Sequence, residues 1–164
     1  MMERRVMVVG LDGAGKSTVA DLIEGEPSDH RHREDLYYRS RVLEVPGRYI
    51  ENHWMHNTIL MLAQNQAAAA LFLIDGDTLE SFYSSGYARA FTIPCLGVLT
   101  KCAHLTPEER ARGMERLVDA GCSESLAVST ETGQGVRELL AWIDGHAMTR
   151  MDASGHRKEE PCAM

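Results

Sequence analysis

The sequence lacks several features that would place it in common classes of protein. No apolar run approaches the ~20 residues of a membrane-spanning helix, and the start does not have the pattern of a signal peptide. Bases are outnumbered, with 17 Lys and Arg against 24 Asp and Glu, so a surface able to neutralise many phosphates of a nucleic acid is not expected. The four cysteines are widely spaced and form no CxxC pair, as is typical of reduced thiols in a cytoplasmic protein. We therefore expect neither nucleic acid nor membrane as a partner.

Internal repeats and low-complexity segments are also missing. At 164 residues, with 44% hydrophobic and 25% charged residues, the chain has the size and composition of one globular domain. We expect that domain over residues 3–147, followed by a polar, flexible C-terminal tail over 148–164.

The strongest signal is the segment from Gly10 to Ser17, a Gly followed by four residues and then Gly-Lys-Ser. It lies between a predicted buried strand and a predicted helix, where backbone amides and the helix dipole favour a phosphate. A glycine-rich turn without a ligand is the alternative. On the functional interpretation Lys16 is the catalytic and phosphate-binding cation and Ser17 binds Mg²⁺. The expected nucleotide contacts in this loop are Gly10, Asp12, Gly13, Ala14, Gly15, Lys16, Ser17 and Thr18.

Apolar segments alternate with helical ones along the rest of the chain. Strands are expected at 5–9, 36–38, 41–45, 67–74, 95–99 and 126–128, and helices at 18–24, 52–64, 79–90, 106–120 and 135–143. This alternation predicts an α/β fold in three layers, a mainly parallel Ras-like sheet with helices on both faces. Ligands of such sheets bind beyond the C-terminal strand ends, where the motifs fall.

Two further motifs follow predicted strands. Glu44-Val45-Pro46-Gly47 occupies the place of the Asp-x-x-Gly of small GTPases, so Glu44 is a candidate Mg²⁺ ligand and Gly47 a candidate phosphate contact. A plain Pro-Gly turn is the alternative. Thr100-Lys101-Cys102-Ala103 stands where GTPases carry Asn/Thr-Lys-x-Asp. Because Ala103 cannot accept hydrogen bonds from guanine, strong guanine selectivity is not expected.

The last predicted strand leads into a loop that resembles the final base-contact loop of GTPases. Ser129, with the glycines that follow it, makes this loop a candidate base contact together with Thr100 and Lys101, and an ordinary strand-to-helix loop is the alternative.

Two catalytic parts of a GTPase are missing. Residues 26–43 contain no Thr to ligate Mg²⁺, and no Gln follows Gly47 to orient a water molecule. Arg48 follows instead, either as a solvated side chain or as a stabiliser of phosphate charge. We expect slow or absent hydrolysis. His53 and His56 have the spacing of a helical metal pair, but no further ligand completes a tetrahedral site.

These motifs, with the stretch from Val45 to Asn52 and the apolar strand into Asp75, resemble the EutP/PduV family of ethanolamine and propanediol utilisation. The resemblance covers about residues 5–145. It implies a Ras-like fold, association with bacterial microcompartments and their shell proteins, and for EutP a proposed acetate kinase activity. The sequence departs from typical members at Glu44 and Ala103, where they carry Asp, and at Arg48, where they carry an acid.

Three functions are consistent with this pattern. The first is an Mg²⁺-dependent nucleotide-binding protein for ATP or GTP, with weak GTPase-like or phosphoryl-transfer activity. The second is a catalytically degenerate targeting or structural module of the microcompartment, and the third is a small-metabolite kinase of the acetate kinase type. The expected location is the cytoplasm, in association with a microcompartment.

Overall fold

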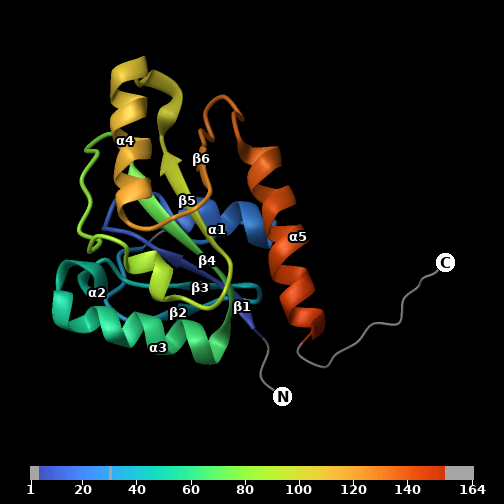
Figure 1. The fold of residues 1–164 in the computed structure, drawn as a ribbon. Coiled ribbons are helices and arrows are strands. Elements are labelled where there is room, and N and C mark those ends of the chain that lie inside the picture. The colour runs from blue at the N-terminus through green and yellow to red at the C-terminus, as the bar shows by residue number, and fades with distance from the viewer. Residues whose placement is uncertain (1–3, 30, 154–164) are drawn as a thin grey trace.

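A six-stranded sheet organises the chain (Figure 1). The computed structural model describes residues 4–29 and 31–153. Its elements are β1 (Arg5–Val9), α1 (Lys16–Glu24), β2 (Tyr37–Tyr38), β3 (Val42–Glu44), α2 (Arg48–Glu51), η1 (His53–Met55), α3 (His56–Gln66), β4 (Ala67–Asp75), η2 (Tyr87–Ala90), β5 (Cys95–Thr100), η3 (Cys102–His104), α4 (Pro107–Asp119), β6 (Ser125–Ala127) and α5 (Val136–Ala153).

The strand order is β2-β3-β1-β4-β5-β6, and every neighbouring pair is parallel except β2 and β3. The two strands predicted at 36–38 and 41–45 are therefore confirmed as β2 and β3, which form the antiparallel edge of an otherwise parallel sheet. The register pairs Val8 with Glu44 and Asp75 with Thr100. The carboxyl ends of β1, β3, β4 and β5 consequently lie at one edge, where a ligand site is expected.

Helices cover both faces of this sheet, as predicted. Successive side chains of a strand point to opposite faces, so β1 contributes Met7 to one apolar core and Val8 to the other. Helices α3 and α4 close the first core, whereas α1 and α5 close the second; Figure 1 shows the two pairs on opposite sides of the strands. The result is the predicted three-layer α/β fold. None of the helices in the described part of the chain is long and apolar enough to cross a bilayer.

The helix predicted over residues 79–90 is wrong. Only η2 forms there, and Leu79 adopts a left-handed backbone with φ of 59°, which a helix cannot accommodate. The apolar residues of this segment instead pack one by one into the core. The buried Tyr83 donates its hydroxyl to the carbonyl oxygens of Val9 and Leu73, at 3.1 and 2.9 Å.

Other boundaries differ by less. The helix predicted over 52–64 forms as η1 and α3 after Asn52, whose extended backbone separates them from α2, a short helix that was not predicted. The helix predicted to begin at Thr106 starts as expected, because the Thr106 and Glu109 side chains cap each other's backbone. Helix α5 continues to Ala153, beyond the expected end at residue 143, so the first part of the segment predicted as a tail is helical. Residues 154–164 lie outside the described part.

Candidate functional site

The loop between β1 and α1 has the backbone of an anion-binding turn. Gly13 and Gly15 have φ values of 84° and 97°, in the left-handed region that favours glycine. Gly10 is restricted by space instead, because a Cβ there would lie 3.1 Å from the Cβ of Leu73. Helix α1 begins at Lys16, so its first unpaired backbone N–H groups belong to this loop. The chain thus builds the predicted combination of strand, glycine turn and helix N-terminus.

Lys16 lies at the centre of this turn. Its Nζ donates to the carbonyl oxygens of Gly10 and Leu11, both at 2.9 Å. Burial lowers the pKa of the Lys16 ammonium, and the carboxylates of Asp12, Glu44 and Glu51 act in the opposite direction. The ammonium is therefore held among backbone oxygens in a partly desolvated position, where an additional negative charge would be stabilising.

Ser17 and Glu44 form the second part of the site. The Ser17 hydroxyl donates to Glu44 Oε1 at 2.9 Å, and Glu44 is buried at the end of β3. The parallel pairing of β1 with β3 places Glu44 opposite Val8, beside the start of the loop. Arg39 pairs with the other carboxylate oxygen at 3.4 Å and with Asp21 at 2.8 Å. The two side chains predicted as metal ligands are thus in contact, and the Arg39 guanidinium pairs with the carboxylate oxygen of Glu44 that does not contact Ser17.

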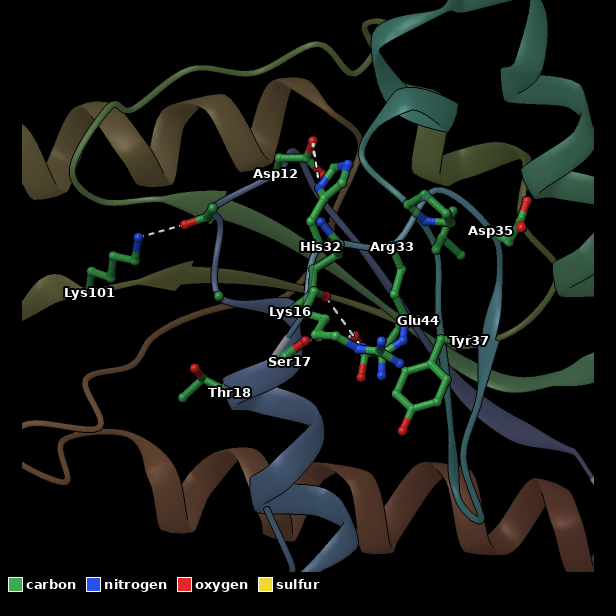
Figure 2. Close-up of a pocket in the computed structure, with 15 residues that line it drawn as sticks. Asp12, Lys16, Ser17, Thr18, His32, Arg33, Asp35, Tyr37, Glu44 and Lys101 are labelled. Carbon is green, nitrogen blue, oxygen red and sulfur yellow. Dashed lines mark hydrogen bonds and ion pairs between the residues drawn. The ribbon is translucent and has the colours of Figure 1, made fainter. Parts of the chain in front are cut away.

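A pocket of about 390 Å³ lies over these residues. Figure 2 shows the side chains of Lys16, Ser17 and Glu44 converging on it. Its lining comprises Asp12, Gly13, Gly15, Lys16, Ser17, Thr18, Arg31, His32, Arg33, Asp35, Tyr37, Glu44, Val45, Pro46 and Lys101. Eight predicted site residues are in this set. The remaining five, Gly10, Ala14, Gly47, Thr100 and Ser129, are not.

Gly47 and Thr100 support the loop from outside the pocket. A Cβ on Gly47 would lie 2.6 Å from the backbone nitrogen of Asp12. Thr100 is buried and donates its hydroxyl to the carbonyl oxygen of Ala14 at 2.7 Å. Both residues therefore fix where the loop lies.

The side chain of Lys101 reaches from the end of β5 to the glycine loop. Its Nζ donates to the carbonyl oxygen of Gly13 at 2.5 Å and pairs with Asp75 at 3.4 Å. Lys101, which was predicted as a base contact, therefore lies along the backbone of the glycine loop. Beside it, Ser129 is buried, and its hydroxyl accepts from the backbone N–H groups of Glu131 and Thr132. Ser129 therefore shapes its own loop.

The side chain of Asp12 reaches the first loop after α1. Its Oδ2 lies 3.7 Å from Nδ1 of His32, and its side chain is half exposed. Figure 2 shows the Asp12 and His32 side chains facing each other at the rim of the pocket.

Seven lining residues were not among the predicted site residues. Val45 and Pro46 belong to the motif at the end of β3. Arg31, His32, Arg33, Asp35 and Tyr37 belong to the segment between α1 and β3, for which the sequence predicts a loop and a short strand. The signal that could have found them is the gathering of bases in a loop that lacks the expected Thr.

Arg48 is held away from a role on phosphate by the same segment. Its Nε donates to the carbonyl oxygen of Glu34 at 2.8 Å, and its Nη2 lies 4.0 Å from Asp35. The side chain remains half exposed. The solvated interpretation of Arg48 fits this geometry better than the catalytic one.

The histidine pair at the start of α3 serves the fold. Nε2 of His56 donates to the carbonyl oxygen of Ile50 at 2.8 Å, and the rings of His53 and His56 are 4.7 Å apart. Within residues 4–29 and 31–153, no group of three or more His, Cys, Asp or Glu side chains could hold a metal ion.

The comparisons with known proteins agree with this geometry. The model of the PduV-EutP family, described as ethanolamine utilisation – propanediol utilisation, matches residues 3–145. The propanediol utilization protein PduV of Citrobacter freundii is 24% identical over 141 residues, which cover 86% of this chain and 93% of that protein.

Solved structures share the fold at lower identity. A probable GTP-binding protein engB has a TM-score of 0.64 and 15% identity, over 88% of this chain and 99% of that one. The translation elongation factor SELB from Methanococcus maripaludis, in complex with the GTP analogue GPPNHP, has a TM-score of 0.54 and 17% identity over 98% of this chain. This chain spans about a third of the elongation factor, 35% of its length. The likeness establishes a GTPase-like P-loop fold.

Proposed function

We propose that this chain, which belongs to the PduV-EutP family, binds a nucleoside triphosphate with Mg²⁺ in the pocket above α1. The observation that carries the proposal is the convergence of Lys16 with the Ser17–Glu44 pair on one pocket. A phosphate needs a cation and backbone donors, and a magnesium ion needs oxygen ligands. The pocket supplies both from neighbouring elements.

On binding, a phosphate oxygen would replace a backbone carbonyl oxygen as the hydrogen-bond partner of Lys16. The ammonium now bonds to two backbone carbonyl oxygens, which are neutral acceptors. A phosphate oxygen carries charge, and hydrogen bonds between ionised groups are roughly twice as strong as neutral ones. The N-terminus of α1 adds its backbone N–H groups and its dipole on the same side. Both terms favour a polyphosphate over a neutral ligand.

The donor set fits Mg²⁺. Ser17 and Glu44 offer a hydroxyl and a carboxylate oxygen 2.9 Å apart, and these hard oxygen ligands suit this ion. The side chain of Glu44 is one methylene longer than that of Asp, and this length lets it contact Ser17 directly. When bound, the ion would neutralise charge between the terminal phosphates. Arg39 keeps the Glu44 carboxylate in place from behind.

Base selection is weak in this proposal. Lys101 lies along the glycine loop, as a base-stacking lysine must, but Ala103 has no acceptor for the guanine ring. On the neighbouring loop Glu131 accepts from His104 at 3.0 Å, so this carboxylate already has a partner. ATP and GTP should bind with affinities within about one order of magnitude.

Turnover should be slow, because the described residues place no glutamine beside Gly47 and Arg48 is held by the carbonyl of Glu34. Family membership supports a role in propanediol or ethanolamine utilisation, in association with the microcompartment. A nucleotide-dependent binding module suits this setting better than a fast hydrolase.

Calorimetry with Mg·GTP, Mg·GDP and Mg·ATP tests the proposal. We expect binding by the wild-type chain and a loss of at least tenfold in Lys16→Ala. Arg137→Gln, a charge-removing change on an exposed part of α5, is the matched control. Absence of binding to all three nucleotides would contradict the proposal.

Turnover assays separate the remaining alternatives. Hydrolysis that is equal in the wild-type chain and Lys16→Ala would leave only a binding role. Acetyl phosphate formed from acetate and ATP would instead identify a small-metabolite kinase, which the resemblance implies for EutP.

A further inference from the structure

The loop between α1 and β2 brings an unassigned cation into the pocket. Arg33 lines the pocket with a side chain that is 21% exposed, whereas its neighbours Arg31 and His32 are 76% and 61% exposed. Arg33 is thus the most buried of the three bases that this segment contributes to the lining. Its guanidinium pairs with the Asp29 carboxylate at 2.8 Å and lines the same pocket as Lys16.

Contacts on three sides hold the Arg33 guanidinium. Its Cζ lies 3.6 Å from the ring centroid of Tyr37, its Nη2 donates to Asp29 at 2.8 Å, and its Nη1 donates to the carbonyl oxygen of Arg31 at 3.3 Å. Stacking and a carboxylate together fix the plane of the group. A guanidinium has five N–H donors, so these contacts leave capacity for an anion.

The position of Arg33 identifies which part of a ligand it would meet. Figure 2 shows Arg33 running toward the group of Lys16, Ser17 and Glu44, on the opposite side of the pocket from Lys101. Lys101 marks the base end, because it lies along the glycine loop from β5. The Ser17–Glu44 pair would hold the metal ion, which would neutralise charge on the terminal phosphates. The terminal phosphate of a nucleotide bound in this direction would therefore lie on the side of Arg33.

We propose that Arg33 binds the terminal phosphate of a nucleoside triphosphate and makes this chain prefer triphosphate over diphosphate. The inference rests on the proposed nucleotide site. In small GTPases a Thr of this loop contacts the metal and the terminal phosphate, and residues 26–43 contain no Thr. In this proposal Arg33 contacts the terminal phosphate instead. An arginine suits a phosphate because its planar fork donates two parallel hydrogen bonds. Asp29 and Tyr37 act as positioning residues, since both hold the guanidinium and neither needs to touch the nucleotide.

The test compares two dissociation constants in each variant, one for a non-hydrolysable Mg·nucleoside triphosphate analogue and one for the Mg·diphosphate of the same base. Arg33→Gln should weaken triphosphate binding by about 10- to 100-fold, the range of a charge-assisted hydrogen bond, and change diphosphate binding less than about threefold. Arg33→Lys should restore part of the loss, because it returns the charge without the fork. Arg137→Gln on α5 should leave both constants unchanged.

Each outcome decides the assignment. If Arg33→Gln weakens triphosphate and diphosphate binding equally, the ratio of the two dissociation constants is unchanged. That result would show a general electrostatic effect and overturn the assignment. Asp29→Asn adds an independent check, since it should lower the triphosphate preference by a smaller factor while Arg33 remains. A wild-type chain that binds neither nucleotide would refute the proposed function itself, and the role of Arg33 with it.

Discussion

Gly47→Ala tests whether the end of β3 sets the position of the glycine loop. Gly47 has φ of −59° and ψ of −31°, which any residue can adopt, so backbone strain is not the issue. Space is the issue. A Cβ there would lie 2.6 Å from the backbone nitrogen of Asp12 and 2.7 Å from its Oδ1. Ordinary van der Waals contacts begin at 3.4 Å, so the backbone of one of the two loops must move.

The size of the effect follows from what has to move. The nearest atom is a backbone nitrogen, which cannot rotate away as a flexible side chain can. Inserting a methyl group into a packed site of this kind typically costs about 1–3 kcal/mol. The displaced segment begins at Asp12, which lines the pocket next to Gly13 and Lys16. Stability and phosphate affinity should therefore fall together, with affinity lowered by about tenfold or more.

Urea unfolding gives the stability change, and calorimetry with the Mg·triphosphate gives the affinity change. Gly145→Ala is the matched control, because a Cβ there meets nothing within 4 Å and the residue lies inside α5. That control should be neutral or stabilise by about 0.5–1 kcal/mol, as alanine does in a helix. If Gly47→Ala unfolds at the wild-type urea concentration and binds nucleotide normally, the contact between the two loops does not determine the site.

Three further predictions follow from the chemistry of single side chains. Ala103→Asp supplies the missing acceptor and should raise the ratio of GTP to ATP affinity by about tenfold, and an unchanged ratio would argue against a guanine-type pocket. Burial lowers the pKa of Lys16, so nucleotide affinity should be full below that pKa and fall as pH rises through it; calorimetry between about pH 7 and 10 on the wild-type chain and Lys16→Arg, which stays charged, would show it. Burial raises the pKa of Cys95 to about 12 and that of Cys122 to about 11, so mass spectrometry should find both thiols alkylated at least about tenfold more slowly in the folded than in the urea-unfolded chain.

The parts of the fold that were predictable are those set by short-range pattern. The continuous apolar run of β4 identifies a strand buried on both faces, and the Thr106–Glu109 pair marks the start of α4. The segment after β4 was mispredicted because its conformation depends on tertiary contacts. Tyr83 reaches strand-end carbonyls from Val9 and Leu73, and nothing in the local spacing of apolar residues indicates this.

The residues of the candidate site likewise divide into those that a sequence pattern predicts and those that depend on tertiary contacts. The glycine loop, Ser17 and Glu44 follow from motif and strand order, because parallel strands bring their carboxyl ends to one edge. Arg33 could not be placed in this way, because its loop has no periodicity and the guanidinium is positioned by an ion pair with Asp29 and by stacking on Tyr37 of β2. A motif therefore identifies the glycine loop, Ser17 and Glu44, but it does not identify Arg33, which lines the same pocket.

Glu44 is predicted from the motif, and its position is fixed by tertiary contacts that the motif does not indicate. A buried carboxylate without a partner is destabilising, yet Glu44 is buried at the end of β3 with Ser17 on one oxygen and Arg39 on the other. Arg39 in turn is fixed by Asp21 of α1 at 2.8 Å, so strand and helix are linked through charge. The oxygens of Ser17 and Glu44 are consequently held in place by contacts within the fold. In the proposed site Glu44 would therefore offer Mg²⁺ a carboxylate whose Oε1 already contacts Ser17 and whose second oxygen is held by Arg39.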